Sequence, residues 1–215
     1  MNQSLRRLGH AVSRRLIDHY WEARFRVTTE TPAPAVGPDS RVYVTLPYRA
    51  IFGILDRLAL SAADTFVEIG CGKGRVLLAA TRYPVAEIVG VELSPELADL
   101  ARGNLGKQAP CAQRFEVSNI AAQEFDFSRG NVYYLYNPFG PDSFRAVLSR
   151  LERGLRERPR PVRIAYVRPC HEDVFHEFKW LEKTGSFEVL DWSAQSMAVS
   201  VWRNTGHPFR SVIPA

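Results

Sequence analysis

Short runs of β-branched and aromatic residues alternate with helix-like segments through the middle of the chain. The apolar runs lie at Thr65–Ile69, Ile88–Val91, Arg114–Val117, Asn131–Tyr136 and Val162–Val167. Runs of this length and composition are typical of buried strands. Between them, apolar residues recur every three or four positions, which indicates helices packed on a core. Strands that alternate with helices predict a parallel sheet with helices on both faces.

The pattern changes towards the carboxyl end. The spacing of Val174, Phe175, Phe178 and Leu181 predicts a helix, and two β-rich runs follow at Phe187–Trp192 and Met197–Trp202. Because these runs lie so close together in the chain, they suit an antiparallel pair. Helix starts are expected at Ser94-Pro95 and at Asp142, where a capping residue stands before an apolar face.

The amino-terminal part has a different composition. Residues 4–25 show helical spacing through Leu5, Leu8, Val12, Leu16, Tyr20 and Trp21, with arginines between them. A proline-rich stretch at 31–40 follows, which is typical of a semi-rigid linker or an exposed loop. We therefore predict a helical arm and linker over 1–40 and one domain over 41–215. The arm is interpreted as a lid or buttress on the core, and the alternative is an arm that touches an anionic substrate or a membrane surface.

A glycine-rich turn joins the first strand to the next helix. Glu68-Ile69-Gly70-Cys71-Gly72-Lys73-Gly74 ends the strand, and Glu92 follows about 20 residues later at the tip of the second strand. A dinucleotide fingerprint requires a small residue where Arg75 stands. A Walker loop requires Ser or Thr after its lysine, where this chain has Gly74. NAD(P) and nucleotide triphosphates are thus disfavoured, and a loop that only reverses the chain remains the plain alternative.

This segment resembles motif I of the class I, seven-β-strand S-adenosylmethionine-dependent methyltransferases. The resemblance extends over about 42–203 and implies a Rossmann-like fold: a seven-stranded, mostly parallel sheet with the last two strands antiparallel. It also implies a methyltransferase with S-adenosylmethionine as cofactor. Glycines let the backbone approach the methionyl part of that cofactor. The glycines are Gly70, Gly72 and Gly74, with Cys71 and Arg75 beside them.

The same resemblance assigns further cofactor contacts. Glu68 is expected to hold the loop and face the ammonium group, while the two carboxylate oxygens of Glu92 suit the ribose hydroxyls. Asn119 would meet the adenine edge, and Leu93 and Ile120 are its neighbours in the site. Upstream, the resemblance makes Thr45 a wall residue at the methionine end, together with Tyr43 and Tyr48. For Asn119, a loop asparagine that caps a turn is the structural alternative.

The fourth strand ends in Asn137-Pro138-Phe139-Gly140. This tip resembles the (Asp/Asn)-Pro-Pro-aromatic signature of methyltransferases that act on amino groups, with one proline where the signature has two. An asparagine oxygen accepts hydrogen bonds from a neutral amine, and an aromatic ring packs on the target or stabilises positive charge. Asn137, Pro138 and Phe139 are therefore the predicted catalytic residues, and Asn137 is also expected at the cofactor. His171 lies beyond the fifth strand, where a histidine at a helix start without a catalytic role is the preferred interpretation and a proton acceptor in the acceptor pocket is the alternative.

Methylation of nitrogen in a protein lysine or another amine is the leading hypothesis. O- or C-methylation of a small metabolite is the alternative, and so is a cofactor-binding module that works through a protein or nucleic acid. The 28 Lys and Arg against 23 Asp and Glu permit a nucleic-acid partner. The three cysteines lack metal spacing, so free thiols in the cytoplasm and no metal are expected. No membrane-spanning run is recognised, and the methyl acceptor stays unknown.

Overall fold

The computed structural model describes residues 15–34, 42–108 and 114–205. Among these residues, seven strands form one sheet in the order β3-β2-β1-β4-β5-β7-β6. β7 is antiparallel to both β5 and β6, and the other neighbours are parallel. The predicted fold class is confirmed. The strands are β1 Thr65–Ile69, β2 Glu87–Glu92, β3 Arg114–Asn119, β4 Val132–Tyr136, β5 Arg163–Val167, β6 Leu181–Leu190 and β7 Ser196–Asn204.

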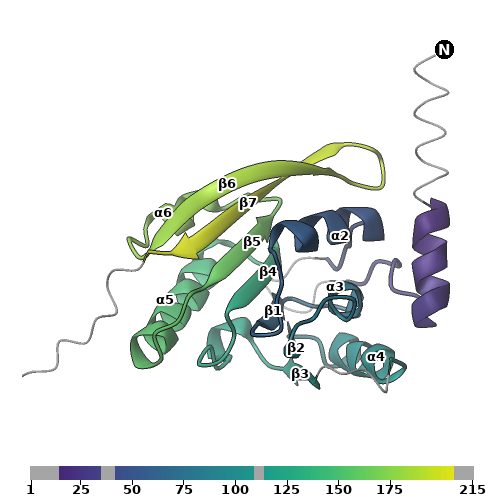
Figure 1. Ribbon diagram of the computed structural model, residues 1–215, viewed down its shortest axis with the longest axis horizontal. Helices are drawn as coiled ribbons and strands as arrows, with labels where there is room; N and C mark the ends of the chain where they lie inside the picture. Colours follow the sequence, from purple (N-terminus) through teal and green to yellow (C-terminus); the bar gives the residue numbers. More distant parts are fainter. Residues whose placement is uncertain (1–14, 35–41, 109–113, 206–215) are drawn as a thin grey trace, which may run out of the picture.

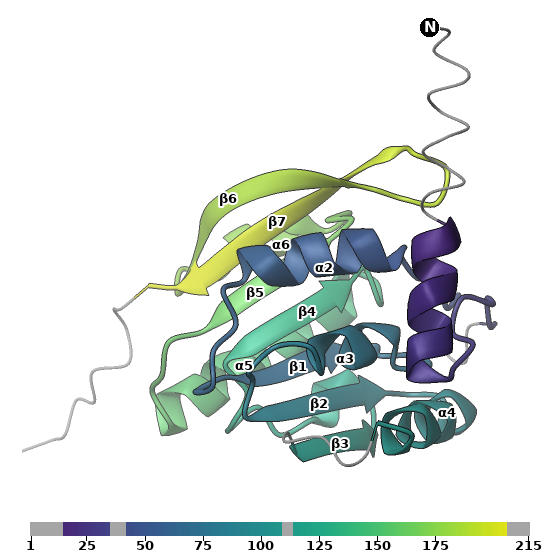
Figure 2. The same cartoon turned by 45° about the vertical axis from the view of Figure 1, so that its right-hand side comes forward.

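Helices cover both faces of the sheet (Figures 1 and 2). Successive residues of a strand point to opposite faces. In β1, Phe66 packs into a core shared with α2, α3 and α4, while Val67 packs into a second core with α5 and α6. The sheet is therefore buried on both sides in its centre. The helices are α2 Tyr48–Arg57, α3 Arg75–Ala80, α4 Pro95–Gly106, α5 Pro141–Glu157 and α6 Glu172–His176, with a short 3-10 turn η1 Ala122–Glu124.

Two helix starts can be compared with their predictions. Ser94 caps α4 as expected, its hydroxyl accepting the Leu97 N–H, with Pro95 in the first turn. α5 instead begins after Gly140, with Pro141 in its first turn, so Asp142 is inside the helix rather than at its cap. Asp142 forms an ion pair with Arg145 one turn on. A proline suits the first helical position because it needs no backbone donor there.

The final helix and hairpin differ from the sequence-based expectation. α6 ends at His176, and β6 already begins at Leu181, which pairs with Asn204 of β7. The expected helix was too long, and the expected strand began six residues too late. β6 is an edge strand whose residues 183–186 are exposed. An exposed strand needs no alternation of apolar side chains, so the hydrophobic pattern carried no signal there.

The amino-terminal helix is confirmed over its described part, residues 15–25. Its buried face is not the predicted one, because Leu16 and Tyr20 are 65% and 59% exposed. Asp18 and Phe25 are buried instead, and Trp21 packs against Phe52 of α2. The expected apolar positions Leu5, Leu8 and Val12 lie outside the described residues. A carboxylate thus occupies a position on the inner face of this helix.

Arg75, the first residue of α3, explains that buried carboxylate. Its guanidinium, 1% exposed, forms ion pairs with Asp18 and, at 2.6 Å, with Glu22. It also donates to the Thr29 hydroxyl at 2.9 Å and to the Leu46 carbonyl at 3.0 Å. The Tyr48 ring lies 3.8 Å beneath the guanidinium carbon. One side chain of the motif therefore fixes the amino-terminal helix and the segment before α2 against the glycine loop.

Replacing Arg75 by Met is expected to lower the free energy of unfolding by about 3–5 kcal/mol, because Asp18 and Glu22 would lose their buried counter-charge. Urea unfolding measures this. The control is Arg145→Met, which removes the exposed pairs with Asp142 and Glu177 and should cost about 1 kcal/mol or less. Adding Asp18→Asn and Glu22→Gln to Arg75→Met should recover part of the loss. Equal, small effects of the two single arginine variants would contradict the central role of Arg75.

Candidate active site

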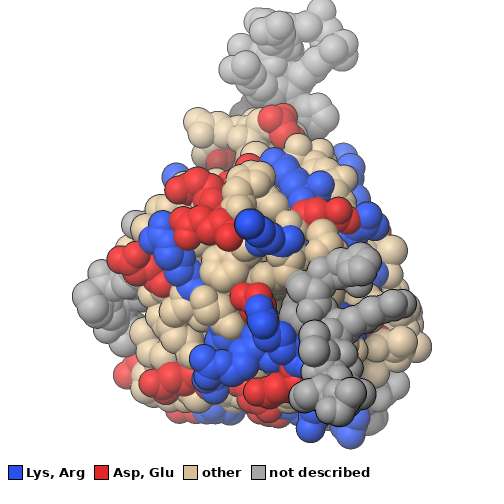
Figure 3. All heavy atoms as spheres, turned by 90° about the vertical axis from the view of Figure 1, so that its left-hand side faces the viewer, with Lys and Arg blue, Asp and Glu red and all other residues tan. Residues whose placement is uncertain are grey.

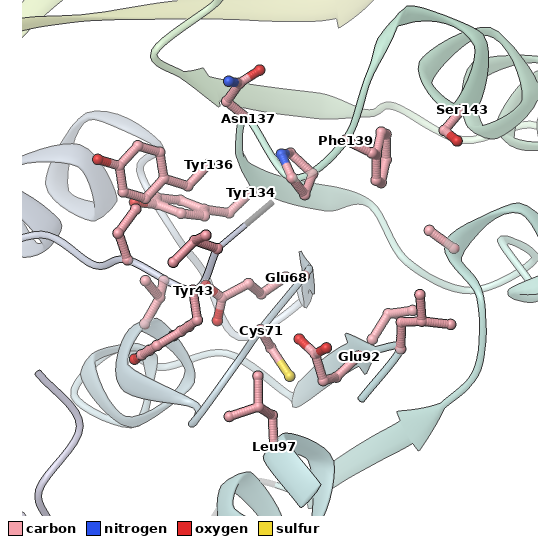
Figure 4. A pocket seen from close by; sticks show the side chains of 18 of the residues that line it. Tyr43, Glu68, Cys71, Glu92, Leu97, Tyr134, Tyr136, Asn137, Phe139 and Ser143 are labelled. Atoms are coloured by element: carbon pink, nitrogen blue, oxygen red, sulfur yellow. The ribbon is translucent and has the colours of Figure 1, made fainter. Parts of the chain in front are cut away.

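A pocket of about 840 Å³ lies at the carboxyl ends of β1, β2 and β4. This is where ligands bind in open α/β sheets. The tips of these strands form its floor, the segment before α2 forms one wall, and the turn after β4 forms another (Figure 4). Most of the predicted site residues line it: Thr45, Glu68, Gly70, Cys71, Arg75, Glu92, Leu93, Ile120, Asn137, Pro138 and Phe139. Gly72, Gly74 and Asn119 are not among its lining residues.

The glycine loop is folded on itself. Gly70, Gly72 and Gly74 have φ angles of 77°, 52° and 79°, which a side chain would strain. The N–H groups of Gly70 and Cys71 both donate to the Val91 carbonyl, and the Gly74 N–H donates to the Cys71 carbonyl. Two of these amides thus hold the loop against β2, and the third closes the loop on itself.

Glu92 is part of the same construction. Its Oε2 accepts the Gly72 N–H at 2.8 Å and its Oε1 accepts the Ser94 N–H at 2.9 Å. A carboxylate oxygen can accept more than one hydrogen bond, so both oxygens retain capacity for a ligand hydroxyl. The residue predicted to hold a ribose therefore also connects β2, the glycine loop and the start of α4.

The side chain of Asn119 forms hydrogen bonds with the backbone at the tip of β2. Its side-chain nitrogen donates to the carbonyls of Glu92 and Leu93, at 3.0 and 2.9 Å. These bonds tie the tip of β3 to the tip of β2. The assignment of Asn119 to adenine stays a prediction, and the neighbouring Ile120 is the residue of this tip that reaches the pocket.

Glu68 is buried on the pocket floor, and its Oε2 has no hydrogen-bond partner among the described residues. Burial raises its pKa well above the ordinary value, the negative charge of Glu92 raises it further, and the Leu77 N–H opposes both. A buried carboxylate without a counter-charge is expensive. A ligand that brings a cation to Glu68 would remove that cost. This carboxylate therefore suits the ammonium end of an amino-acid ligand.

The tip of β4 brings the predicted catalytic residues to the upper rim (Figure 4). Asn137 has φ 39°, rare for a residue with a side chain, and its Oδ1 accepts the Tyr166 hydroxyl at 3.1 Å. The Tyr166 oxygen accepts the His171 N–H in turn. Phe139 packs on Phe144, with ring centroids 4.6 Å apart, so its ring belongs largely to the core.

Tyr134, Tyr136 and Arg168 are among the pocket residues that sequence reasoning missed. Tyr134 and Tyr136 alternate along β4 on the face that carries Glu68 in β1, since Glu68 and Tyr134 are register partners. The run Val132–Tyr136 is apolar and aromatic throughout, so its sequence does not separate Tyr134 and Tyr136 from core residues. Arg75 lines the pocket, but its guanidinium is taken by Asp18 and Glu22. Over the described ranges, no group of acidic, histidine and cysteine side chains is arranged for a metal.

A family model described as "Methyltransferase domain" matches residues 66–158. The match spans β1 to the last turn of α5 and contains the glycine loop, Glu92 and Asn137. Residues 66–158 are thus similar to this methyltransferase domain, in a match shorter than half of the chain. S-adenosylmethionine is the methyl donor expected for such a domain, and the loop, Glu92 and the uncompensated Glu68 suit its sugar and its charged end.

Solved structures share the fold of this chain. An RNA methyltransferase from Salinibacter ruber in complex with S-adenosyl-L-homocysteine has a TM-score of 0.56 and 22% identity, over 78% of this chain and 98% of that one. A SAM-dependent methyltransferase from Aquifex aeolicus has a TM-score of 0.57 and 11% identity, over 72% and 89% of the two chains. At these identities the likeness shows the fold alone.

Curated relatives match shorter stretches. A histone-lysine N-methyltransferase specific for H3 lysine-79 from Dictyostelium discoideum is 31% identical over 96 residues, covering 39% of this chain. A ribosomal protein L11 methyltransferase from Dechloromonas aromatica is 30% identical over 79 residues, covering 37% of this chain. The matched stretches amount to only 5% and 26% of these two relatives. Within the described ranges no helix is long and apolar enough to cross a membrane.

The affinity of the protein for S-adenosylhomocysteine is expected to rise with pH below about pH 7.5, where the ligand's α-amino group stays protonated. In the ligand-free protein the raised pKa of Glu68 favours its neutral form, so binding an ammonium releases a proton. Calorimetry in buffers of different ionisation enthalpy measures that proton. Glu92, Tyr43, Cys71 and Tyr134 also face this site electrostatically.

Glu68→Gln is the matched variant for this experiment. It should remove the proton release and flatten the pH dependence. Neutral Glu68 contributes stability that is complete below its unfolded pKa of about 4.3 and is lost as pH rises through the folded value. The ligand-free variant should therefore unfold at a higher temperature than the wild type at neutral pH. An unchanged proton count in the variant would show that another group titrates.

Glu92→Gln is expected to weaken S-adenosylhomocysteine and 5′-methylthioadenosine by similar factors, of about tenfold each, because both ligands carry the ribose. Glu68→Gln should weaken only the first, since the second lacks the amino-acid end. Titration calorimetry with both ligands on both variants gives the comparison. Loss of the first ligand alone in Glu92→Gln would place the ribose elsewhere.

Proposed function

We propose that the protein is an S-adenosylmethionine-dependent methyltransferase that acts on nitrogen, in a protein lysine or another amine. The observation that carries the nitrogen assignment is the Asn137 amide at the pocket rim, directly beyond β4. When bound, the cofactor supplies an electrophilic methyl group on a sulfonium. The work left to the chain is to align the acceptor and to place charge.

Asn137 is held in the orientation that this role requires. The Tyr166 hydroxyl donates to one lone pair of Oδ1, which leaves the second lone pair for an N–H of the acceptor. The positive φ of Asn137 turns the chain sharply, so that Pro138 comes against Gly70, where an added Cβ would lie 2.9 Å from the proline Cβ. The acceptor-aligning amide and the glycine loop are thereby adjacent across the pocket.

Two relatives support the choice of a protein amine. Their names describe a histone-lysine N-methyltransferase and a ribosomal protein L11 methyltransferase. A lysine acceptor must lose its proton before it can react, because its free pKa is about 10.4. His171 lines the same pocket and is the candidate to receive that proton, directly or through water.

Methylation of an oxygen or carbon of a small metabolite is the second candidate. A third relative, a trans-aconitate 2-methyltransferase from Methylobacterium radiotolerans, favours it with 37% identity over 57 residues. Arg168, with an exposed side chain, also lines the pocket and would suit an acidic acceptor. Screening amines against phenols and carboxylates separates the two candidates.

The arginine-rich face of α5 gives less support to a nucleic-acid partner than its sequence suggested. Arg145 pairs with Asp142 and Glu177, and Arg156 pairs with Glu152. Arg150 donates to the carbonyls of Phe125 and Glu124. Acidic and basic side chains are interspersed on the face shown in Figure 3. These three arginines are engaged in contacts within the molecule and are therefore less available to a nucleic acid. We accordingly favour an enzyme over a binding module.

Asn137→Ala is expected to lower kcat on an amine acceptor at least 100-fold while the affinity for S-adenosylhomocysteine changes less than about threefold, because the amide aligns the acceptor only. Ser143→Ala, which removes another polar group from the pocket lining, is the control and should retain activity. Turnover assays and calorimetry on both variants give the two numbers. Near wild-type turnover by Asn137→Ala would refute its catalytic role.

A further inference from the structure

Arg168 and Asn137 hold matching positions at the ends of two adjacent strands. Tyr136, the last residue of β4, is the register partner of Val167, the last residue of β5, and Asn137 and Arg168 come next on the two strands. Both line the pocket, and both have a positive φ, 39° for Asn137 and 51° for Arg168. Such strain in residues with side chains is typical of functional sites. Arg168 therefore stands beside the residue that we propose to align the acceptor.

The turn at Arg168 is held by hydrogen bonds of its backbone. The Arg168 N–H donates to the Ala198 carbonyl of β7 at 2.9 Å, and the Arg168 carbonyl accepts the Cys170 N–H at 2.7 Å. Glycine would adopt this φ without strain, whereas this chain has an arginine. The side chain is exposed, so it does not stabilise the fold through burial. Its contribution is a guanidinium at the pocket, carried by a fixed backbone.

The guanidinium of Arg168 forms no ion pair with a carboxylate of the described residues. Arg75, which also lines the pocket, is by contrast neutralised by Asp18 and Glu22. A planar guanidinium matches the geometry of a carboxylate or a phosphate, which it binds through two hydrogen bonds. Arg168 thus offers the pocket a positive charge that the fold leaves unpaired.

Asp191 is an acidic neighbour on the turn between β6 and β7. Its charge acts on the phenol of Tyr136, whose pKa it helps to raise. The Oδ1 of Asp191 accepts the N–H groups of Ser193 and Gln195, at 2.8 and 2.9 Å. This carboxylate therefore closes its own turn, and the charge of Arg168 is left for a ligand.

The pocket is divided by charge. Its acidic lining residues, Glu68 and Glu92, belong to β1 and β2. Figure 4 shows Glu92 across the pocket from Asn137. On the side of β4 and β5, burial raises the pKa of Tyr136 while the nearby positive charge of Arg168 lowers it. A ligand at the ends of β4 and β5 thus meets a cation, and one at the ends of β1 and β2 meets carboxylates.

We propose that Arg168 binds an anionic group, a carboxylate or a phosphate, that the methyl acceptor carries near its nitrogen. The substrate class is then an amine with a negative charge of its own. This inference rests on the proposed function for the position of the nitrogen at Asn137. Two sources supply this chemistry: a small amino acid or phosphorylated amine, and a peptide lysine with acidic neighbours. Arg168 is thereby a specificity-determining residue for the acceptor.

Methyl transfer from S-adenosylmethionine to matched acceptor pairs tests the proposal. The small pairs are γ-aminobutyrate with butylamine, and phosphoethanolamine with ethanolamine. The peptide pair is a lysine peptide with glutamates on both sides of the lysine and the same peptide with glutamines. The full chain is expected to prefer the anionic member of a pair at least tenfold in kcat/KM. The pair that shows this preference identifies the source of the anion.

Arg168→Met should raise KM for the preferred acceptor about 10- to 100-fold and change kcat less than about threefold, because the anion is held alike in the ground and transition states. The affinity for S-adenosylhomocysteine should stay the same. Arg168→Lys keeps the charge but lacks the fork, so its KM should fall between the two. Arg168→Gly should share the KM defect and keep or raise Tm, since glycine relieves the strain.

Arg153→Met is the matched control. Arg153 is an exposed arginine of α5 outside the pocket lining, and its replacement changes the net charge by the same amount. This variant should leave kcat and KM unchanged for both members of each pair. The proposal is overturned if the wild type shows no preference for anionic amines, or if Arg168→Met keeps the wild-type KM. Turnover of no amine in the panel would instead refute nitrogen methylation, the proposed function itself.

Discussion

The ion-pair cluster around Arg75 is the constraint on which the rest of the site depends. α3 is only six residues long, and its first side chain is turned away from solvent into two carboxylates and a tyrosine ring. A buried guanidinium without partners would destabilise the fold, so the amino-terminal helix must dock for the glycine loop to keep its place. The described helix 15–25 therefore supports the pocket through Arg75, which also holds the Leu46 carbonyl next to the pocket residues Tyr43 and Thr45.

Electrostatic asymmetry runs along the pocket floor. The positive charge of Arg75 is neutralised by Asp18 and Glu22, whereas Glu68 has no cationic partner among the described residues, and its raised pKa favours the neutral form until a cation binds. Glu92 lies further along, with both oxygens bonded to backbone amides. A ligand with a cationic end and a hydroxylated middle matches this sequence of charges, which is the order found in S-adenosylmethionine.

Much of the architecture was predictable because central parallel strands are buried on both faces and read as continuous apolar runs. The glycine loop and Glu92 were also found in sequence, since the turn requires residues that tolerate positive φ. Asp18 could not be found, because a carboxylate on the inner face of a helix makes sense only once Arg75 lies opposite. The start of the edge strand β6 was predicted too late because its first half is largely exposed and therefore has no hydrophobic alternation that marks a strand. Tyr134 was overlooked because an aromatic residue in a strand is indistinguishable from core until its hydroxyl is seen to lack a partner.

The two hydrogen bonds that Glu92 accepts couple ligand binding at this residue to the shape of the glycine loop. Any sugar hydroxyl that approaches Oε2 shares that oxygen with the Gly72 N–H, so the shape of the loop responds to occupation of the sugar subsite. The adenosine half and the amino-acid half of a ligand would then not bind as independent fragments. The binding free energies of the two separate halves would then not add up to the binding free energy of the intact ligand. The size of the difference would measure how strongly the five-residue glycine loop resists a change of shape.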